Sequence, residues 1–365
     1  MLGLLAIAGC VQPQPPLKDA FVGQFLVGAA LNESQFTEQD ATKTALISKH
    51  FNSITPENVL KWESVQPELG RFDFAAADRY VAFGEKHGMF IIGHTLVWHS
   101  QTPSWVFEAS RGGAADRETL LARMSNHIHA VVGRYKGRIK GWDVVNEALN
   151  EDGSLRRSPW LKCIGEDYLV KAFEFAHAAD PAAELYYNDF SLENEPKRRG
   201  AVRLVQKLQA AGVKIHGIGT QQHLRLDQPT PAQVDDTLTA LGQLGIKVMV
   251  TELDVDVLPS HRQDQTAEVS LRFAADAGLN PYTNGLPAEV QQQLARRYGE
   301  LFALYLKHST TLDRVTFWGV TDGDSWLNDW PIQGRTAYPL LFERSGEPKR
   351  ALSAVLESAK KTGLQ

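Results

Sequence analysis

Eight short apolar runs alternate with segments of helical spacing along almost the whole chain of 365 residues. Several helical segments stop at Gly212, Gly245 or Asp180-Pro181, where a helix is expected to end. Eight strand-then-helix units predict a parallel sheet that closes on itself, with the helices outside. The expected strands are 25–31, 51–56, 90–98, 139–147, 184–190, 215–224, 247–255 and 314–321, and the clearest helices are 120–135, 168–179, 197–211, 233–244 and 289–308.

We therefore predict one α/β domain, a single (β/α)8 TIM barrel, over residues 20–360. A barrel of about 250 residues with insertions fits this length in one piece. An open, doubly wound sheet is the alternative, and it would need a glycine-rich phosphate loop after the first strand. The first strand reads V-G-A-A-L at 27–31 and offers no such loop.

Charge and hydropathy exclude two classes of partner. The formal net charge is −5, and the longest basic run is K-R-R at 197–199, which argues against nucleic acid and against a polybasic membrane patch. No stretch of eighteen apolar residues predicts a transmembrane helix.

The first residues predict an exported protein. The apolar run 1–9 is followed by Cys10, and residues 7–10 resemble the lipobox of bacterial lipoproteins. The run lacks the basic start and usual length of a signal peptide, so either the precursor begins upstream or the run is not a signal. We expect residues 1–10 to be a truncated lipoprotein signal and residues 11–19 a proline-rich tether. The predicted location is the outer membrane, otherwise the periplasm or the medium. Cys163, the second of two cysteines, is expected to be a small buried hydrophobe.

Two apolar strands carry a glutamate where they end. The first reads W-D-V-V-N-E and ends at Glu147, and the second reads V-M-V-T-E-L-D and contains Glu252. Most of the 43 acidic residues must be solvated surface charges, but a charge that directly follows a buried strand is usually paired or functional. Two carboxyl groups at the open end of a barrel predict the hydrolysis of glycosidic bonds.

Polar and aromatic residues gather at the other strand ends, where the active sites of such barrels lie. They occur in T-P-E-N-V-L-K-W, G-H-T-L-V-W-H-S-Q, Y-Y-N-D-F, T-Q-Q-H-L and F-W-G-V-T-D-G-D-S-W. From these motifs the residues expected to bind substrate are Glu57, Asn58, Lys61, His94, Trp98, Gln101, Tyr187, Asn188, Gln221, Trp318 and Trp326.

Together with N-P-Y-T-N-G-L-P at 280–287 and A-Y-P-L-L-F at 337–342, these motifs closely resemble glycoside hydrolase family ten, the endo-β-1,4-xylanases. The resemblance runs from about residue 20 to 350. It implies that Glu147 is the acid/base, that Glu252 is the nucleophile and that Asn146 binds the sugar 2-hydroxyl. It also implies retaining hydrolysis of xylan and xylo-oligosaccharides through a covalent intermediate. No cofactor and no metal are expected, and the chain is expected to act as a monomer.

A retaining mechanism needs the two carboxyl groups roughly 5 to 5.5 Å apart with separated pKa values. Asp143 is expected on the same strand face as Glu147, where its charge would raise the pKa of Glu147; a satisfied core carboxylate is the alternative. His223 and Asp254 are expected to form a chain that orients Glu252. A metal site made from His94, His99 and His223 is disfavoured because no H-x-x-x-H or H-E-x-x-H spacing occurs.

The resemblance also implies which sugar each polar residue contacts. Gln221 and His94 are expected on the sugar that reacts, and Glu57, Asn58, Lys61 and Gln101 on the next sugar towards the non-reducing end. Trp98, Trp318 and Trp326 offer apolar faces for sugar rings, and a tryptophan over carbon five would exclude the hydroxymethyl group of glucose.

Two departures from the family pattern concern the product side of the cleft. Gln222 stands where many relatives have a small residue, and the loop 256–286 is long and without a clear pattern. Two rival functions are a retaining glycanase for cellulose or mannan and a glycan-binding lipoprotein that has lost catalysis. The presence of both strand-end glutamates disfavours the second rival.

Overall fold

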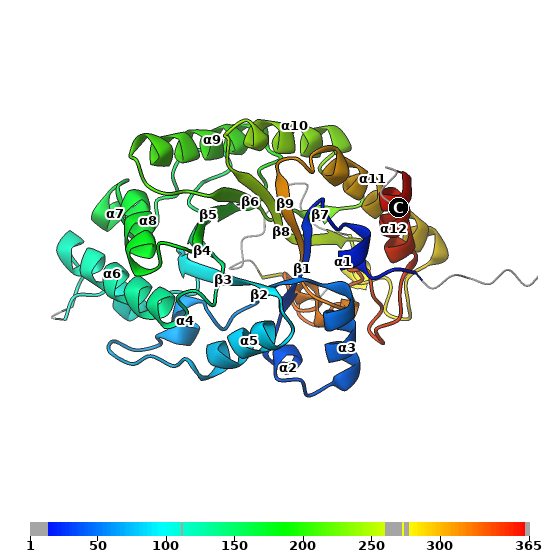
Figure 1. The fold of residues 1–365 in the computed structure, drawn as a ribbon, viewed down its shortest axis with the longest axis horizontal. Coiled ribbons are helices and arrows are strands. Elements are labelled where there is room, and N and C mark those ends of the chain that lie inside the picture. Colours follow the sequence, from blue (N-terminus) through cyan, green and yellow to red (C-terminus); the bar gives the residue numbers. More distant parts are fainter. Residues whose placement is uncertain (1–13, 111, 260–271, 274–276, 362–365) are drawn as a thin grey trace, which may run out of the picture.

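A computed structural model describes residues 14–110, 112–259, 272–273 and 277–361, and its strands form a closed barrel. Each barrel strand pairs in parallel with the next, and β1 pairs with both β2 and β9, which closes the ring (Figure 1). The predicted (β/α)8 barrel is therefore confirmed. Its strands are β1 (Leu26–Leu31), β2 (Ser53–Pro56), β3 (Phe90–Val97), β4 (Gly141–Asn146), β5 (Glu184–Asp189), β6 (Gly217–Thr220), β8 (Lys247–Asp256) and β9 (Leu312–Phe317).

The sixth predicted strand, 215–224, is not one strand. It divides into β6 and the short β7 (His223–Arg225), because Gln222 has a left-handed backbone conformation with φ of 60°. β7 pairs only with the outer part of β8, where His223 lies opposite Asp254. This extra pairing accompanies the length of β8, which runs for ten residues and continues past its pairing with β6.

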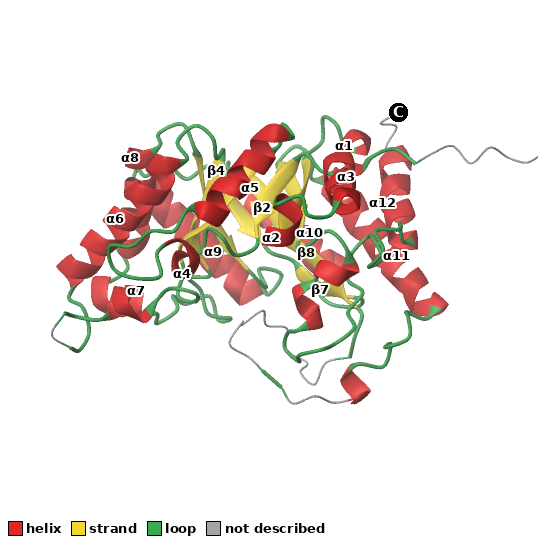
Figure 2. Ribbon diagram, turned by 90° about the horizontal axis from the view of Figure 1, so that it is seen from below, coloured by secondary structure: helices red, strands yellow, loops and turns green. Residues whose placement is uncertain are grey.

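Helices surround the barrel (Figure 2). Their ends follow capping signals in the sequence: Asp116 accepts a hydrogen bond from the Thr119 amide at the start of α6, and Thr230 forms a capping box with Gln233 ahead of α10. The helices are α1 (Leu17–Ala20), α2 (Glu33–Phe36), α3 (Ala41–His50), α4 (Trp62–Val65), α5 (Ala75–Lys86), α6 (Arg117–Arg134), α7 (Pro159–Ile164), α8 (Tyr168–Ala179), α9 (Glu195–Ala210), α10 (Pro231–Gly242), α11 (Ala288–Lys307) and α12 (Arg350–Lys361).

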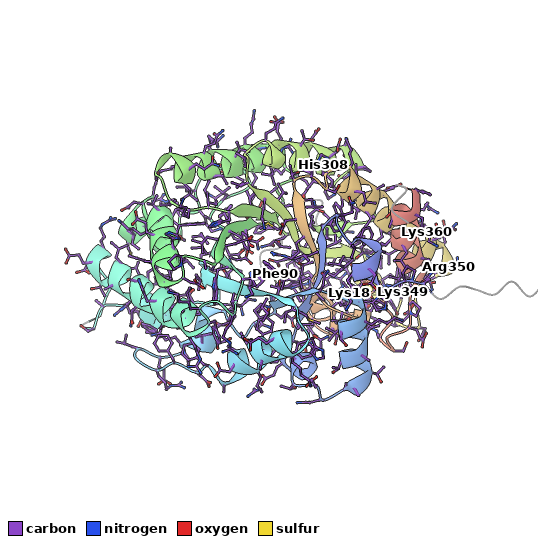
Figure 3. The ribbon with its side chains drawn as sticks, viewed as in Figure 1. Lys18, Phe90, His308, Lys349, Arg350 and Lys360 are labelled. Carbon is purple, nitrogen blue, oxygen red and sulfur yellow. The ribbon has the colours of Figure 1, made fainter. Side chains whose placement is uncertain are left out.

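Most of the core lies between strands and helices, and a smaller cluster fills the barrel interior. Ile92, Tyr186 and Met249 come from β3, β5 and β8 and are fully buried together. Phe90 packs against them at the start of β3, near the centre of the ring in Figure 3. Side chains from alternate strands form such layers in TIM barrels, so the interior is packed and the polar residues lie above it.

The first described residues pack on the barrel. Leu17 is fully buried, α1 contacts α3 and α12, and the Gln14 side chain donates a hydrogen bond to Ser353 Oγ at 2.7 Å. Residues 17–19, which were expected to belong to a tether, therefore lie in a packed helix. Cys10 lies outside the described residues, so its lipidation stays a prediction. No helix within the described ranges is long and apolar enough to cross a membrane.

Candidate active site

Glu147 lies immediately after β4, on a turn of the backbone. Its φ is 56°, and its amide donates to the Asn188 carbonyl at 2.9 Å. A side chain with positive φ is uncommon and often marks a functional position. The turn aims the Glu147 carboxylate into the top of the barrel, where the residue is only 5% exposed.

Three side chains hold the Glu147 carboxylate. Oε2 accepts a hydrogen bond from Trp98 Nε1 at 2.8 Å, while Oε1 accepts from Gln221 Nε2 at 3.0 Å and from Asn146 Nδ2 at 3.2 Å. Trp98 is almost fully buried. Its indole therefore orients a carboxylate, a role that the sequence-based expectation of sugar stacking did not include.

Glu252 lies within β8, at the height where the barrel strands end. Asn188 Nδ2 donates to its Oε1 at 2.8 Å, and His223 Nε2 lies 3.2 Å from its Oε2. His223 Nδ1 lies 3.0 Å from Asp254 Oδ2, which also accepts a hydrogen bond from Trp326 Nε1 at 2.8 Å. The structure thus contains the expected chain from carboxylate to imidazole to carboxylate.

The two glutamates have opposite pKa shifts. Burial, followed by the negative charges of Asp189 and Glu252, raises the pKa of Glu147 to about 7. Burial alone would raise the pKa of Glu252 too, but the His223 hydrogen bond, the nearby His94 and the Asn188 hydrogen bond bring it below its usual value. Burial opposes a charge on His223 as well, yet Asp254 and Glu252 raise its pKa to about 10. Near neutral pH Glu147 can hold a proton while Glu252 is ionised.

Asp143 does not have the role expected of it. Its Oδ2 pairs with His94 Nδ1 at 2.9 Å, so the alternative of a paired core carboxylate is correct. A register shift between Asp143 and Val145 breaks the two-residue alternation on which the expectation rested. The charge that raises the pKa of Glu147 belongs instead to Asp189, at the end of β5.

Asp189 was missed by the sequence reasoning, although it directly follows Asn188 at a strand end. It is fully buried, pairs with the buried Lys197 at 3.1 Å and accepts a hydrogen bond from the Tyr187 hydroxyl. Tyr187 is itself fully buried, so it lies behind the site and not on the surface of the cleft, as had been expected. Asn188 is also fully buried and supports the site by bridging Asn146 Oδ1 and Glu252.

A polar group beside the glutamates comes from β2 and β3. Lys61 Nζ donates to Asn58 Oδ1 at 3.0 Å and to Gln101 Oε1 at 2.7 Å, and it lies 5.2 Å from the centre of the Trp98 ring. Burial lowers the pKa of Lys61, and the negative charges of Glu252 and Glu57 offset part of this decrease. Burial raises the pKa of Glu57 to about 7. The structure therefore brings together the four residues predicted for the next sugar, which are Glu57, Asn58, Lys61 and Gln101.

Two tryptophans and two histidines form an aromatic wall on the other side. Trp318 meets His94 and His223 edge-on, with centroids 5.6 and 6.3 Å apart, and Trp326 lies 4.8 Å from His223. Trp330, which was not predicted, stacks on Trp326 at 4.3 Å. Trp326 is partly exposed, so part of its ring is available to a ligand.

The histidines of the hypothetical metal site have other partners. His94 pairs with Asp143, and His223 bridges Glu252 and Asp254. Among the described residues, no group of three or more histidine, cysteine, aspartate or glutamate side chains is arranged to hold a metal ion.

Comparisons with known proteins place this geometry in a family. A family model described as glycosyl hydrolase family 10 matches residues 16–358. Endo-1,4-beta-xylanase A of Xylanibacter ruminicola is 44% identical over 98% of this chain and 96% of its own length. The beta-1,4-xylanase of Dictyoglomus thermophilum is 40% identical, over 94% of this chain and 91% of its own. A solved GH10 endoxylanase from a sugarcane soil metagenome is 47% identical, with a TM-score of 0.91 over 93% of this chain and 99% of that one.

Proposed function

Since the chain belongs to glycosyl hydrolase family 10, we propose that it cleaves internal β-1,4-xylosidic bonds of xylan and xylo-oligosaccharides with retention of configuration. The observation that carries this proposal is the pair of buried glutamates with opposite pKa shifts. Glu147 can donate a proton at a pH where Glu252 is a carboxylate, as a double displacement requires.

In the first step, Glu252 attacks the anomeric carbon while Glu147 gives its proton to the departing glycosidic oxygen. The bond between that carbon and the leaving sugar breaks, and an ester between the sugar and Glu252 forms. In the second step, Glu147, now a carboxylate, removes a proton from water, and the water oxygen displaces Glu252. The glycosidic oxygen thus leaves as a hydroxyl, the water oxygen becomes the new hydroxyl on the anomeric carbon, Glu252 is released as a carboxylate, and Glu147 recovers its proton.

The surrounding residues prepare these steps. The His223 and Asn188 hydrogen bonds fix the Glu252 carboxylate and keep it ionised, and Asp254 holds the His223 ring in place. Asn146 and Gln221 donate hydrogen bonds to Glu147 Oε1, and these bonds stabilise the negative charge that Glu147 carries between the two steps. Fixed dipoles of this kind stabilise developing charge without reorganisation.

We propose that the polar group of Glu57, Asn58, Lys61 and Gln101 binds the next sugar on the non-reducing side. The wall of Trp318 and Trp326 would lie over carbon five of the reacting sugar, where glucose carries a hydroxymethyl group. Exclusion by a rigid ring discriminates more strongly than a missing methylene, which is worth about 1–3 kcal/mol.

The test is product analysis on xylan, carboxymethyl cellulose and mannan, together with proton NMR of the first product of xylohexaose. We expect hydrolysis of xylan, a mixture of oligomers early in the reaction and an initial β-anomer. Preference for cellulose or mannan would assign the chain to the rival glycanases. An initial α-anomer would rule out double displacement, and no hydrolysis of any of them would favour a binding protein.

We also propose that Cys10 carries lipid and attaches the enzyme to the outer membrane, with the residues before Leu17 as a short spacer. The support is the resemblance of residues 7–10 to a lipobox. A full-length precursor and its Cys10→Ser variant should be compared by cell fractionation. Membrane association of the first form alone is expected, and equal distribution of both would exclude the anchor.

A further inference from the structure

The segment Gln221 to His223 connects the two catalytic glutamates. Gln221 donates a hydrogen bond to Glu147, and His223, two residues later, contacts Glu252. Their positions relative to each other depend on the residue between them. Gln222 has φ of 60°, a conformation that is uncommon for a residue with a side chain.

The backbone of this segment is tied to the glutamate strand. The Glu252 amide donates to the Gln221 carbonyl at 2.9 Å, and the Asp254 amide lies 3.4 Å from the Gln222 carbonyl. Between β6 and β7 the pairing with β8 shifts by one residue, since Thr220 lies opposite Val250 and His223 opposite Asp254. The turn at Gln222 accommodates this shift.

The side chain of Gln222 points away from the glutamates, towards the helices. It is 1% exposed, and its Oε1 accepts a hydrogen bond from the Tyr305 hydroxyl of α11 at 2.5 Å. It also lies beside the buried Glu193, whose pKa is raised by burial and only partly brought back by its neighbours, among them Thr220, which donates to Glu193 Oε1 at 3.1 Å. A buried amide with a hydrogen-bond partner holds its backbone more firmly than a small side chain could.

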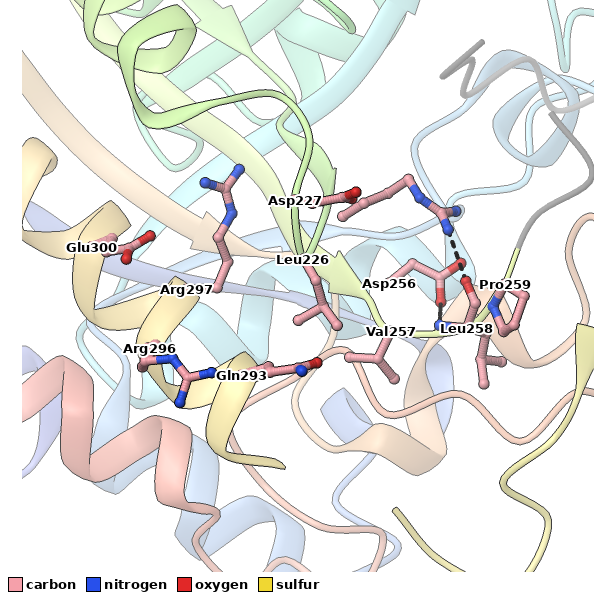
Figure 4. A pocket seen from close by; sticks show the side chains of 11 residues that line it. Leu226, Asp227, Asp256, Val257, Leu258, Pro259, Gln293, Arg296, Arg297 and Glu300 are labelled. Atoms are coloured by element: carbon pink, nitrogen blue, oxygen red, sulfur yellow. Dashed lines mark hydrogen bonds between the residues drawn. The ribbon is translucent and has the colours of Figure 1, made fainter. Parts of the chain in front are cut away.

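A second hydrogen bond from α11 reaches the turn after β7. Arg297 Nη2 donates to the Pro229 carbonyl, in the turn after β7. Figure 4 shows Arg297 of α11 beside Leu226, the residue after β7. Arg225 Nη2 donates a hydrogen bond to the Leu258 carbonyl at 3.0 Å. α11 therefore contacts this part of the chain at Gln222, between β6 and β7, and again at Pro229, after β7.

We propose that Gln222 is a positioning residue for the hydrolysis, which fixes Gln221 against Glu147 and His223 against Glu252 through its hydrogen bond with Tyr305. The inference rests on the proposed function.

The electrostatic consequence makes this proposal testable. The Gln221 hydrogen bond lowers the pKa of Glu147, and the His223 hydrogen bond lowers that of Glu252. If Gln222 is released, both contacts loosen and both pKa values rise. A purely structural role would change stability without moving either value.

Two variants release Gln222 in different ways. Gln222→Gly removes the side chain and tolerates the left-handed backbone, whereas Tyr305→Phe removes only the hydroxyl that holds the amide. Tyr298→Phe is the matched control, because Tyr298 lies on the same helix, is equally buried and donates its hydroxyl hydrogen bond to the Pro339 carbonyl and not to Gln222.

The Trp98 indole NH, which donates to Glu147, reports the titration of that carboxyl by NMR even in an inactive protein. We expect its midpoint to move to higher pH in Gln222→Gly and, less, in Tyr305→Phe, and to stay in Tyr298→Phe. On xylan, kcat should fall roughly tenfold in Gln222→Gly with little change in KM, since small misplacements of catalytic groups are costly.

An unchanged Trp98 midpoint in both folded variants would overturn the proposal, whatever their melting temperatures. Failure of the proposed function would look different, because the wild-type protein would then not hydrolyse xylan at all while the titration of Glu147 could still be followed.

Discussion

At the scale of single residues, the proposed chemistry depends on two buried glutamates whose neighbours offset the effect of burial on their pKa values to different extents. Glu147 and Glu252 are equally buried at 5% exposure, yet their pKa values shift in opposite directions. The difference lies in their neighbours: Asp189 adds negative charge beside Glu147, whereas His223 brings positive charge to Glu252. Environment therefore decides which carboxyl is the acid.

The pKa of Glu147 predicts the alkaline limit of activity. A general acid must be protonated, so kcat/KM on xylan should fall as the pH rises through about 7. Glu147→Gln should remove this limb. It should also reduce activity on xylan far more than on an aryl xyloside with an acidic phenol, which departs without protonation. Equal losses on both substrates would assign the proton to another group.

Asp189→Asn tests the second cause of that pKa shift. Removal of this negative charge should lower the pKa of Glu147 and move the alkaline limb to lower pH. The substitution also breaks the buried pair with Lys197, which costs about 3–5 kcal/mol of stability in comparable cases. The limb should be measured at a temperature where circular dichroism shows the variant folded. A limb that stays in place would mean that burial and the charge of Glu252 raise the pKa without Asp189.

At the scale of the elements, small residues on the strands allow large side chains to pack. A Cβ at Gly93 of β3 would lie 2.1 Å from the Trp142 ring of β4, and one at Gly141 would lie 2.4 Å from Tyr186. Neither glycine has a positive φ, so both are required for space and not for backbone conformation. Close approach of neighbouring strands thus depends on these positions.

Gly93→Ala should therefore destabilise the fold by about 1–3 kcal/mol, the usual cost of overpacking. Gly133→Ala is the control, since a Cβ at this position in the last turn of α6 meets nothing within 4 Å. It should leave stability unchanged or raise it by up to about 1 kcal/mol. Urea denaturation of the two variants gives the comparison, and equal midpoints would show that Trp142 moves aside without cost.

At the scale of the whole molecule, the first described helix, α1, packs against the last, α12. α1 packs beside α3 as well as α12 (Figure 1). Phe21 stacks on Phe25 and contacts Phe302 of α11. Segments from both ends of the chain therefore share one part of the core.

Phe21→Ala should lower the free energy of unfolding by about 3–5 kcal/mol, as for other buried phenylalanines. The neighbouring Val22 is 71% exposed, and Val22→Ala should leave the melting temperature unchanged. Activity per folded molecule should be the same in both. If Phe21→Ala were as stable as the wild type, α1 would not be part of the cooperative fold.

The sequence by itself determined the strand order, the barrel and the placing of both glutamates, because hydrophobic periodicity and strand ends are local properties. It also led to the His223–Asp254 pair, whose members lie opposite each other on β7 and β8. Only the tertiary structure decided the partners of Asp143, the role of Asp189 and the burial of Tyr187. It also revealed the break at Gln222. At Asp143 a register shift and at Gln222 a left-handed residue interrupt the two-residue alternation, so the direction of a side chain there is set by neighbouring strands and helices and not by its position in the sequence.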